Sequence, residues 1–270
     1  MTTRLDDCFL ELRATGATGL VTYVTAGDPD RVRSEAILRT LDSAGADVLE
    51  VGVPFSDPVA DGPVIQRASE RALAGGMTLA STLDLVARVR PTVRAPIVLF
   101  TYANPVLRIG LVEFAKRAAG VGVDGVLALD LPIEEASGLR DALNGAGIAP
   151  IFLLSPTTTR ERIAKAADLG RGFLYGISRL GVTGVSDRVS AGARDLAARI
   201  RDVTDMPLAV GFGISHPDHV AEVGQWADAA VVGSGLVALI AEHGRSPDLD
   251  REVASYVQWL KSGTGVDERT

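Results

Sequence analysis

Cysteine is nearly absent from this sequence, which has only Cys8 among its 270 residues. A single cysteine cannot form a disulfide bond within the chain, so the core must hold the fold together. A chain of this length buries roughly three quarters of the surface that it exposes when unfolded. Because the sequence has no disulfide framework, it fits a reducing compartment, and we expect a cytoplasmic protein.

Long apolar segments are also absent. The longest nearly uncharged stretch, 229–241, is interrupted by Gly233 and Gly235, whereas a helix that crosses a bilayer needs about 20 apolar residues. The first residues, MTTRLDDCFLELR, are acidic and lack the apolar segment and cleavage site of a secretory signal. We therefore expect neither membrane insertion nor secretion.

Lysine is scarce, since only Lys116, Lys165 and Lys261 contribute to the 27 basic residues. The 34 acidic residues give a net charge of −7, and no basic run supports nucleic-acid binding. Lys116 and Lys165 fall in predicted helices, and Lys261 lies near the C-terminus. A Schiff-base aldolase or a pyridoxal phosphate enzyme needs a lysine in its pocket. Both classes are disfavoured, and we expect no cofactor on this chain.

The three histidines, His216, His219 and His243, do not form a metal-ligand pattern. His216 and His219 are three residues apart at a predicted helix start, but no set of carboxylates or cysteines completes a zinc site. We expect these two side chains to cap the helix or face solvent, and we expect no metal centre.

The sequence has 29 glycines and a repeated alternation of short apolar segments with segments of helical period. Strands that are apolar on both faces are typical of a parallel sheet covered by helices. The predicted strands cover 19–27, 46–53, 95–102, 123–130, 148–154, 172–177, 207–213 and 228–234. The predicted helices cover 31–44, 79–90, 111–119, 133–144, 159–167, 189–203, 218–224, 236–243 and 249–260, with another starting near Val64.

Eight such units match a (β/α)₈ TIM barrel, an α/β fold, with extra short helices. The rival fold is a doubly wound open sheet, which usually has a G-x-G-x-x-G turn after its first strand. The turn here is AGDPD (26–30), which lacks that pattern. No Pro- or Ser-rich linker divides the chain, so we predict one domain over residues 1–270.

Catalytic groups of a barrel lie at the C-terminal ends of its strands. Glu50 lies inside the apolar segment LEVGVPF, where a carboxylate is costly unless it is paired or functional. Its neighbours on the same face would be Val48 and Gly52, and the glycine would leave space beside it. Two roles stay open for Glu50: an acid–base group in a pocket, or a brace that bonds a neighbouring strand.

The following loop, PFSDPVADGP (54–63), carries Asp57 and Asp61 among three prolines. Prolines stiffen a loop, which suits precise placement of a side chain. Asp61 and Glu50 could divide acid and base roles if their environments separate their pKa values. The alternative for Asp61 is a cap on the helix that follows Pro63. For Asp130, which also ends a strand, a role in a helix-entry turn is favoured because Pro132 follows.

Two glycine-rich loops predict a phosphate site. GFGIS (211–215) follows the seventh strand and VGSG (232–235) follows the eighth, the usual place for phosphate in a barrel. Glycines let backbone N–H groups approach an anion, and a helix N-terminus favours negative charge. Ser234 could add a hydroxyl. A third glycine-rich loop, SRLGVTG (178–184), could close over a ligand or be a plain connection.

The segment LEVGVPFSDPVADGPVIQRA (49–68) closely resembles the signature of the tryptophan synthase alpha chain family. The resemblance continues in family order through VTAGDP (24–29), TYANPV (101–106), GVDGVLALDLPIEE (122–135), SPTT (155–158), SRLGVTG (178–184), VGFGIS (210–215) and VVGSGLV (231–237). It implies a lyase that cleaves indole-3-glycerol phosphate to indole and glyceraldehyde 3-phosphate by a retro-aldol reaction. Thr22, Val64 and Leu180 differ from what many members carry.

The resemblance also implies roles for individual residues. Glu50 would handle the protons at indole C3 and at the glycerol hydroxyl, and Asp61 would accept the indole N–H proton. Thr183 would orient the catalytic aspartate. The residues expected around the indole are Tyr23, Phe100, Tyr102, Tyr175 and Phe212, and those expected at the phosphate are Gly184, Gly213, Gly233 and Ser234. For Tyr23 and Phe100, core packing is an equal alternative.

The family works with a beta chain that uses pyridoxal phosphate to join indole with serine. The resemblance therefore implies an αββα heterotetramer, with contacts from the loop 54–58, which includes Asp57, from SPTT and from Asn104-Pro105. Three other functions stay open: a stand-alone lyase, a non-catalytic subunit that only activates its partner, and another phosphate-binding barrel such as a related synthase or isomerase.

Overall fold

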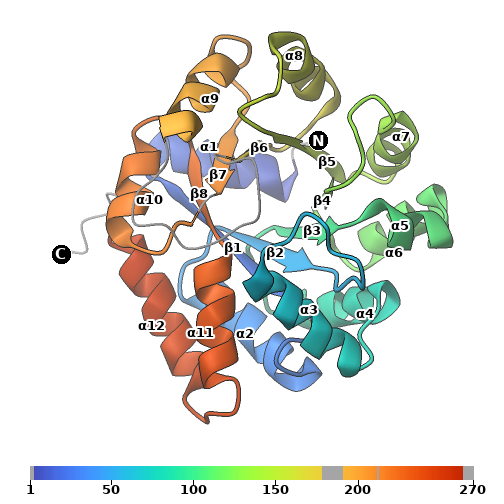
Figure 1. The fold of residues 1–270 in the computed structure, drawn as a ribbon, viewed down its shortest axis with the longest axis vertical. Helices are drawn as coiled ribbons and strands as arrows, with labels where there is room; N and C mark the ends of the chain where they lie inside the picture. Colours follow the sequence, from blue (N-terminus) through green and yellow to red (C-terminus); the bar gives the residue numbers. More distant parts are fainter. Residues whose placement is uncertain (1–2, 178–190, 212, 264–270) are drawn as a thin grey trace.

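The computed structural model describes residues 3–177, 191–211 and 213–263. Eight parallel strands close into a barrel in the order β1 to β8, and helices surround it (Figure 1). The predicted (β/α)₈ fold is confirmed. The assignment of the chain to one domain stays a prediction.

The strands are shorter than the predicted segments but coincide with all eight of them. They are β1 (Gly19–Thr25), β2 (Val48–Gly52), β3 (Ile97–Thr101), β4 (Gly125–Ala128), β5 (Ala149–Leu154), β6 (Leu174–Ile177), β7 (Leu208–Gly211) and β8 (Ala229–Val232).

The helices include all of the predicted ones and two others, α1 and α5. They are α1 (Arg4–Thr15), α2 (Arg31–Ser43), α3 (Pro63–Ala74), α4 (Leu79–Val89), α5 (Ala103–Ile109), α6 (Leu111–Gly120), α7 (Ser137–Gly145), α8 (Arg160–Leu169), α9 (Ala191–Arg201), α10 (Pro217–Gly224), α11 (Ser234–His243) and α12 (Leu249–Lys261). Among the described residues no single helix is long and apolar enough to cross a membrane, and only the pair α3 and α4, bent by 92°, meets that test together.

Alternating strand residues face the barrel interior and the surrounding helices. The outward residues join one large core with the helices. The inward residues form a second core, which includes Val21, Val48, Val98, Leu127, Ile151 and Val231. Three inward side chains near the C-terminal ends of their strands, Phe100, Leu153 and Ile177, are only partly buried. The barrel is therefore filled at its N-terminal end and more open at the end where catalytic groups are expected.

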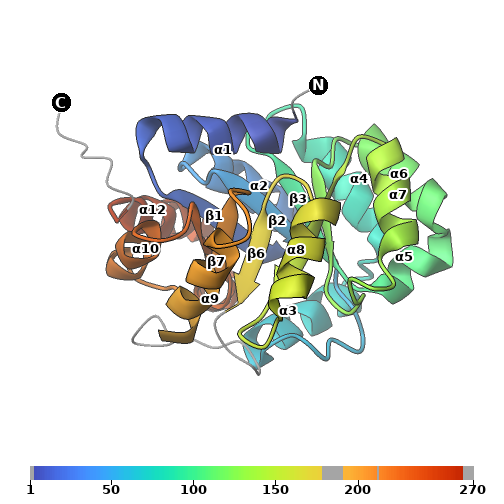
Figure 2. The ribbon, with the colours of Figure 1, turned by 90° about the horizontal axis from the view of Figure 1, so that it is seen from above.

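Helix α1 closes the N-terminal end of the barrel. It lies across that end while β6 points away from it (Figure 2). Leu5, Phe9 and Leu12 are buried in the interior core, and the rings of Phe9 and Phe173 are 5.4 Å apart. Thr3 caps the helix in a capping box with Asp6. The helix thus supplies the apolar filling that the small residues at the strand starts leave out.

Three aspartates fix the strand starts and hold α1 in place. Each precedes an even-numbered strand and accepts the N–H of a residue at the start of the strand before it: Asp47 from Leu20 (2.7 Å), Asp124 from Ile97 (2.8 Å) and Asp228 from Leu208 (2.7 Å). These N–H groups would otherwise be unpaired, which is costly where water is excluded.

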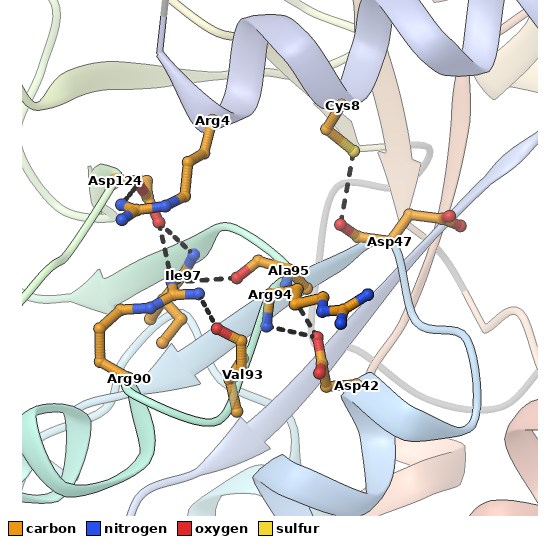
Figure 3. Close-up of polar contacts among 10 residues, drawn as sticks. All are labelled: Arg4, Cys8, Asp42, Asp47, Arg90, Val93, Arg94, Ala95, Ile97 and Asp124. Atoms are coloured by element: carbon orange, nitrogen blue, oxygen red, sulfur yellow. Dashed lines mark hydrogen bonds and ion pairs between the residues drawn. The ribbon is translucent and has the colours of Figure 1, made fainter.

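Helix α1 contacts all three aspartates. Arg4 pairs with Asp124 at 2.9 Å, and Arg13 pairs with Asp228 at 2.9 Å. Between them the Cys8 thiol donates to the carbonyl oxygen of Asp47 at 3.4 Å. Figure 3 shows the contact of Arg4 with Asp124 and that of Cys8 with Asp47. Arg90, at the C-terminus of α4, also pairs with Asp124. Helix α1 is thus held at both ends and at its middle.

We expect Asp228→Asn to lower the free energy of unfolding by about 2 kcal/mol at pH 7, because Arg13 and Arg201 lose their charged partner. Burial would raise the pKa of Asp228, but hydrogen bonds from Arg13 and the Leu208 N–H outweigh it and lower the pKa. Its contribution is therefore present above the unfolded pKa of about 4 and is lost as the pH falls through the lowered value. Urea titrations should show a smaller difference in unfolding free energy between the wild type and Asp228→Asn at pH 3 than at pH 7.

The matched control for this experiment is Asp218→Asn, because the Asp218 side chain is 89% exposed. It should change the unfolding free energy little at either pH. Equal losses in both variants would contradict the anchoring role of Asp228.

Candidate active site

Glu50 is the middle residue of β2 and faces the barrel interior. It lies in register with Tyr23 of β1 and Val98 of β3. The residue is fully buried, and neither carboxylate oxygen has a hydrogen-bond partner among the described residues. A brace to a neighbouring strand, the alternative left open by the sequence, is therefore not observed there.

The burial of Glu50 controls its charge. Loss of water around the carboxylate raises the pKa from 4.5 to about 8, because a carboxylate in an apolar site is more stable with its proton. Glu50 is therefore mostly protonated at pH 7 and can donate a proton. A buried acid without a structural partner is typical of a functional group.

Asp61 is fixed by the stiff loop 54–62 between β2 and α3. Its N–H donates to the Pro58 carbonyl at 3.0 Å, and its own carbonyl accepts from Gln66 Nε2 at 2.9 Å. Its side chain bonds the Tyr102 hydroxyl. The N-cap of α3 is Gly62, which has no side-chain cap bond, so Asp61 does not act as the helix cap.

The environments of the two carboxylates separate their pKa values. Burial raises the pKa of Asp61 from 3.8 to about 6, and the hydrogen bond from Tyr102 opposes this rise. At pH 7 Asp61 is mostly ionised while Glu50 is mostly protonated. The pair therefore offers one proton donor and one proton acceptor at the same end of the barrel.

Tyr102 links the loop of Asp61 to the end of β3. Its hydroxyl also accepts the Ala60 N–H at 3.1 Å. Its ring stacks on Phe55, with centroids 4.8 Å apart. Tyr102 thus contacts the loop through one ring stack and two polar contacts. Its predicted contact with indole stays untested.

Three of the predicted aromatic residues lie together inside the barrel. The ring of Phe100 is 5.1 Å from that of Tyr23 and 6.3 Å from that of Tyr175. Two glycines make room for the tyrosine hydroxyls. A Cβ on Gly52 would lie 2.1 Å from the Tyr23 hydroxyl, and one on Gly211 would lie 2.9 Å from that of Tyr175.

Three of the four predicted phosphate residues, Gly213, Gly233 and Ser234, lie after two neighbouring strands, β7 and β8. Gly233 is the N-cap of α11 and Ser234 is its first residue, and no side chain caps this helix. Gly213, after β7, has a φ of +58°, which favours glycine. Backbone N–H groups at such a helix start suit an anion. Thr183, Gly184 and Phe212 lie outside the described residues, as does the loop 178–187.

The other polar residues singled out in the sequence have structural contacts. Asp130 accepts the Ala103 N–H at 2.7 Å and so caps the start of α5. His216 is the N-cap of α10, and His219 accepts the Ser215 N–H. Asp57 is exposed and accepts the hydroxyl of Ser56. Within the described parts of the chain no group of three potential ligands could hold a metal ion.

Some residues at the site were not predicted from the sequence. Leu153 and Ile177 lie partly exposed on the interior face near the strand ends and pack against the interior core. Their alternation with outward residues was a usable signal, because every second residue of a strand faces the same side. Gln66 had no such signal, since its bond to the Asp61 carbonyl depends on the shape of the loop.

Comparison with known proteins identifies the family. The sequence model of the tryptophan synthase alpha chain family matches residues 9–263. The tryptophan synthase alpha chain of Solibacter usitatus is 46% identical over 263 residues, which is 97% of each chain. That of Geobacter sulfurreducens is 48% identical over 262 residues, 97% of this chain and 99% of the relative.

Solved structures agree with the sequence matches. Tryptophan synthase of Mycobacterium tuberculosis superposes with a TM-score of 0.91 at 36% identity, covering 98% of this chain and 99% of the other. The alpha subunit from Legionella pneumophila has a TM-score of 0.90 at 34% identity, with 98% and 99% coverage. The chain therefore belongs to the tryptophan synthase alpha chain family, lyases that cleave indole-3-glycerol phosphate in tryptophan biosynthesis.

Proposed function

We propose that Glu50 and Asp61 carry out the family's retro-aldol cleavage as an acid–base pair. The observation that carries this proposal is their separation in pKa, about 8 against about 6, within one end of the barrel. Glu50 has no hydrogen-bond partner among the described residues, and Asp61 does not cap α3. No lysine or metal is needed for the proton transfers.

The reaction needs protons moved at three atoms. Protonated Glu50 donates to indole C3 while ionised Asp61 accepts the ring N–H proton. The Glu50 carboxylate then takes the proton of the hydroxyl on the glycerol carbon next to the ring. The carbon–carbon electron pair returns to the ring as the aldehyde forms, and Asp61 gives its proton back to the ring nitrogen. Indole and glyceraldehyde 3-phosphate leave, and both acids regain their starting states.

The remaining site residues would bind the substrate. The start of α11, with Gly233 and Ser234, and the loop at Gly213 favour the phosphate through their N–H groups. Gly184 would join them, and Thr183 would orient Asp61. The indole would lie among the aromatic side chains of Tyr23, Phe100, Tyr102, Tyr175 and Phe212.

A beta chain is the expected partner. Val59 in the loop 54–62 is 82% exposed and Leu107 of α5 is 58% exposed, so both offer apolar surface near the open end. Asp57, Asn104-Pro105 and the segment 155–158 belong to the same proposed contact. The partner would carry pyridoxal phosphate, which this chain has no pocket lysine to bind. The assembly would be αββα and cytoplasmic.

Glu50→Gln and Asp61→Asn should each reduce indole release from indole-3-glycerol phosphate by at least a hundredfold, a typical contribution of one acid–base group. The measurement compares purified chain with and without the beta chain. Slow release by the wild type that rises with the partner is expected. Full activity in both variants would contradict the assignment of the pair.

The same measurement separates the alternatives. Fast release by the isolated chain would favour a stand-alone lyase. A chain that activates its partner and never releases indole would be a regulatory subunit.

The pH dependence of kcat/KM should follow a bell between about 6 and about 8, because activity needs Asp61 ionised and Glu50 protonated. Tyr102→Phe should move the acid limb to higher pH, since the lost hydrogen bond no longer favours ionised Asp61. The alkaline limb should not move. An unchanged acid limb would show that another group controls it.

Val59→Asp and Leu107→Asp should abolish most of the stimulation by the beta chain and leave the activity of the isolated chain within about twofold, because they place a charge in an apolar contact. Leu10→Asp is the matched control, since Leu10 is 59% exposed on α1 at the other end of the barrel. Equal loss in all three variants would contradict the proposed contact.

A further inference from the structure

The side chain of Tyr23 connects the phosphate end of the site with the catalytic strand. A Cβ on Gly233, at the start of α11, would lie 3.6 Å from the Tyr23 Cβ. At its other end the Tyr23 hydroxyl lies over Gly52, two residues after Glu50 on β2. Tyr23 therefore covers the distance between the expected phosphate position and the catalytic carboxylate.

The Tyr23 hydroxyl forms a pair with the hydroxyl of Thr25. Tyr23 Oη and Thr25 Oγ1 are 3.4 Å apart, and their residues are only 5% and 2% exposed. Two hydroxyls bring two donor hydrogens, and the single contact between them uses one. Among the described residues no acceptor takes the other.

A buried donor without an acceptor is costly, and beside the expected substrate position a group supplied on binding can satisfy it. The pair lies on the interior face of β1, since Val21 on the same face belongs to the interior core. Tyr23 also packs with Ile65 of α3, Val237 of α11 and the ring of Phe100.

The substrate supplies such a group, if the proposed function holds. Its phosphate would lie at Gly233 and Ser234, and the bond to be cleaved would lie at Glu50. The glycerol chain must then run alongside Tyr23. One of its two hydroxyls is consumed in the cleavage, and the other takes no part in the chemistry.

We infer that the Tyr23–Thr25 hydroxyl pair recognises the non-reacting glycerol hydroxyl of the substrate. Tyr23 is then a specificity-determining residue for the glycerol chain, in addition to its expected place beside the indole. The pair distinguishes a hydroxylated phosphate chain from a plain alkyl phosphate. Only the hydroxylated chain has an oxygen that accepts the second hydrogen of the pair and a hydroxyl hydrogen that it can donate to the pair.

Tyr23→Phe and Thr25→Val test this role with two ligands. Each variant should raise KM for indole-3-glycerol phosphate about tenfold with kcat within twofold, the pattern of a contact that binds ground state and transition state equally. The second ligand is 3-(indol-3-yl)propyl phosphate, which lacks both glycerol hydroxyls. Its inhibition constant should change less than twofold. Thr25→Ser keeps the hydroxyl and should restore most of the affinity.

Thr22→Val is the matched control. Thr22 lies on the same strand, faces the helices, and its buried hydroxyl has no partner among the described residues. This variant should leave both constants unchanged. A wild-type chain that cleaves substrate, with Tyr23→Phe affecting both ligands equally or neither, would overturn the inference and leave the proposed function standing. A wild type that releases no indole would instead overturn the proposed function.

Discussion

The rest of the barrel has to hold the carboxyl group of Glu50 in a buried position where water is excluded. An acid whose pKa is raised from 4.5 to about 8 disfavours the folded state as the pH rises through that interval, because the unfolded chain can ionise freely. The protein keeps this group in an interior position, where no described residue forms a hydrogen bond with it. Such a position persists only if the surrounding strands cannot shift to provide one.

The opposite end of the barrel provides that rigidity. The aspartates before β2, β4 and β8 satisfy strand-start N–H groups, and α1 is fixed against them by Arg4, Cys8 and Arg13. The apolar side chains of α1 fill the barrel interior from its N-terminal end. These polar contacts and this close packing lie at the N-terminal end of the barrel, whereas the carboxylate oxygens of Glu50 have no hydrogen-bond partner among the described residues.

The loop 54–62 shows a similar division between one side that is held by contacts and one side that is exposed. Its backbone is held by internal hydrogen bonds and by Gln66, and its aspartate is held by Tyr102, which Phe55 covers on its ring face. The same loop presents Val59 to solvent. A partner that contacts Val59 would therefore touch a segment whose other side orients Asp61, which is a physical route for coupling the two chains.

Much of this protein is determined by its sequence alone. The alternation of apolar and amphipathic segments specifies the barrel, because a buried parallel strand and a covering helix have different periods. The scarcity of lysine disfavours Schiff-base chemistry, and the segment 49–68 carries both carboxylates that the family resemblance implies as catalytic. Helix α1 is not predicted, although Leu5, Phe9 and Leu12 have helical spacing, because the acidic first residues are considered only as a possible secretory signal. Helix α5 is missed because it is short and carries Pro105.

Only the tertiary structure decides how the two carboxyl groups ionise. A raised pKa for Glu50 depends on the absence of partners from other strands, and a moderate one for Asp61 depends on Tyr102, which is 41 positions away in the chain. The Tyr23–Thr25 pair matters because no acceptor within the described parts of the chain takes its second hydroxyl hydrogen. Local sequence sets which groups are available, whereas pKa values and unmet hydrogen bonds are properties of the whole enclosure, since they depend on every atom that replaces water.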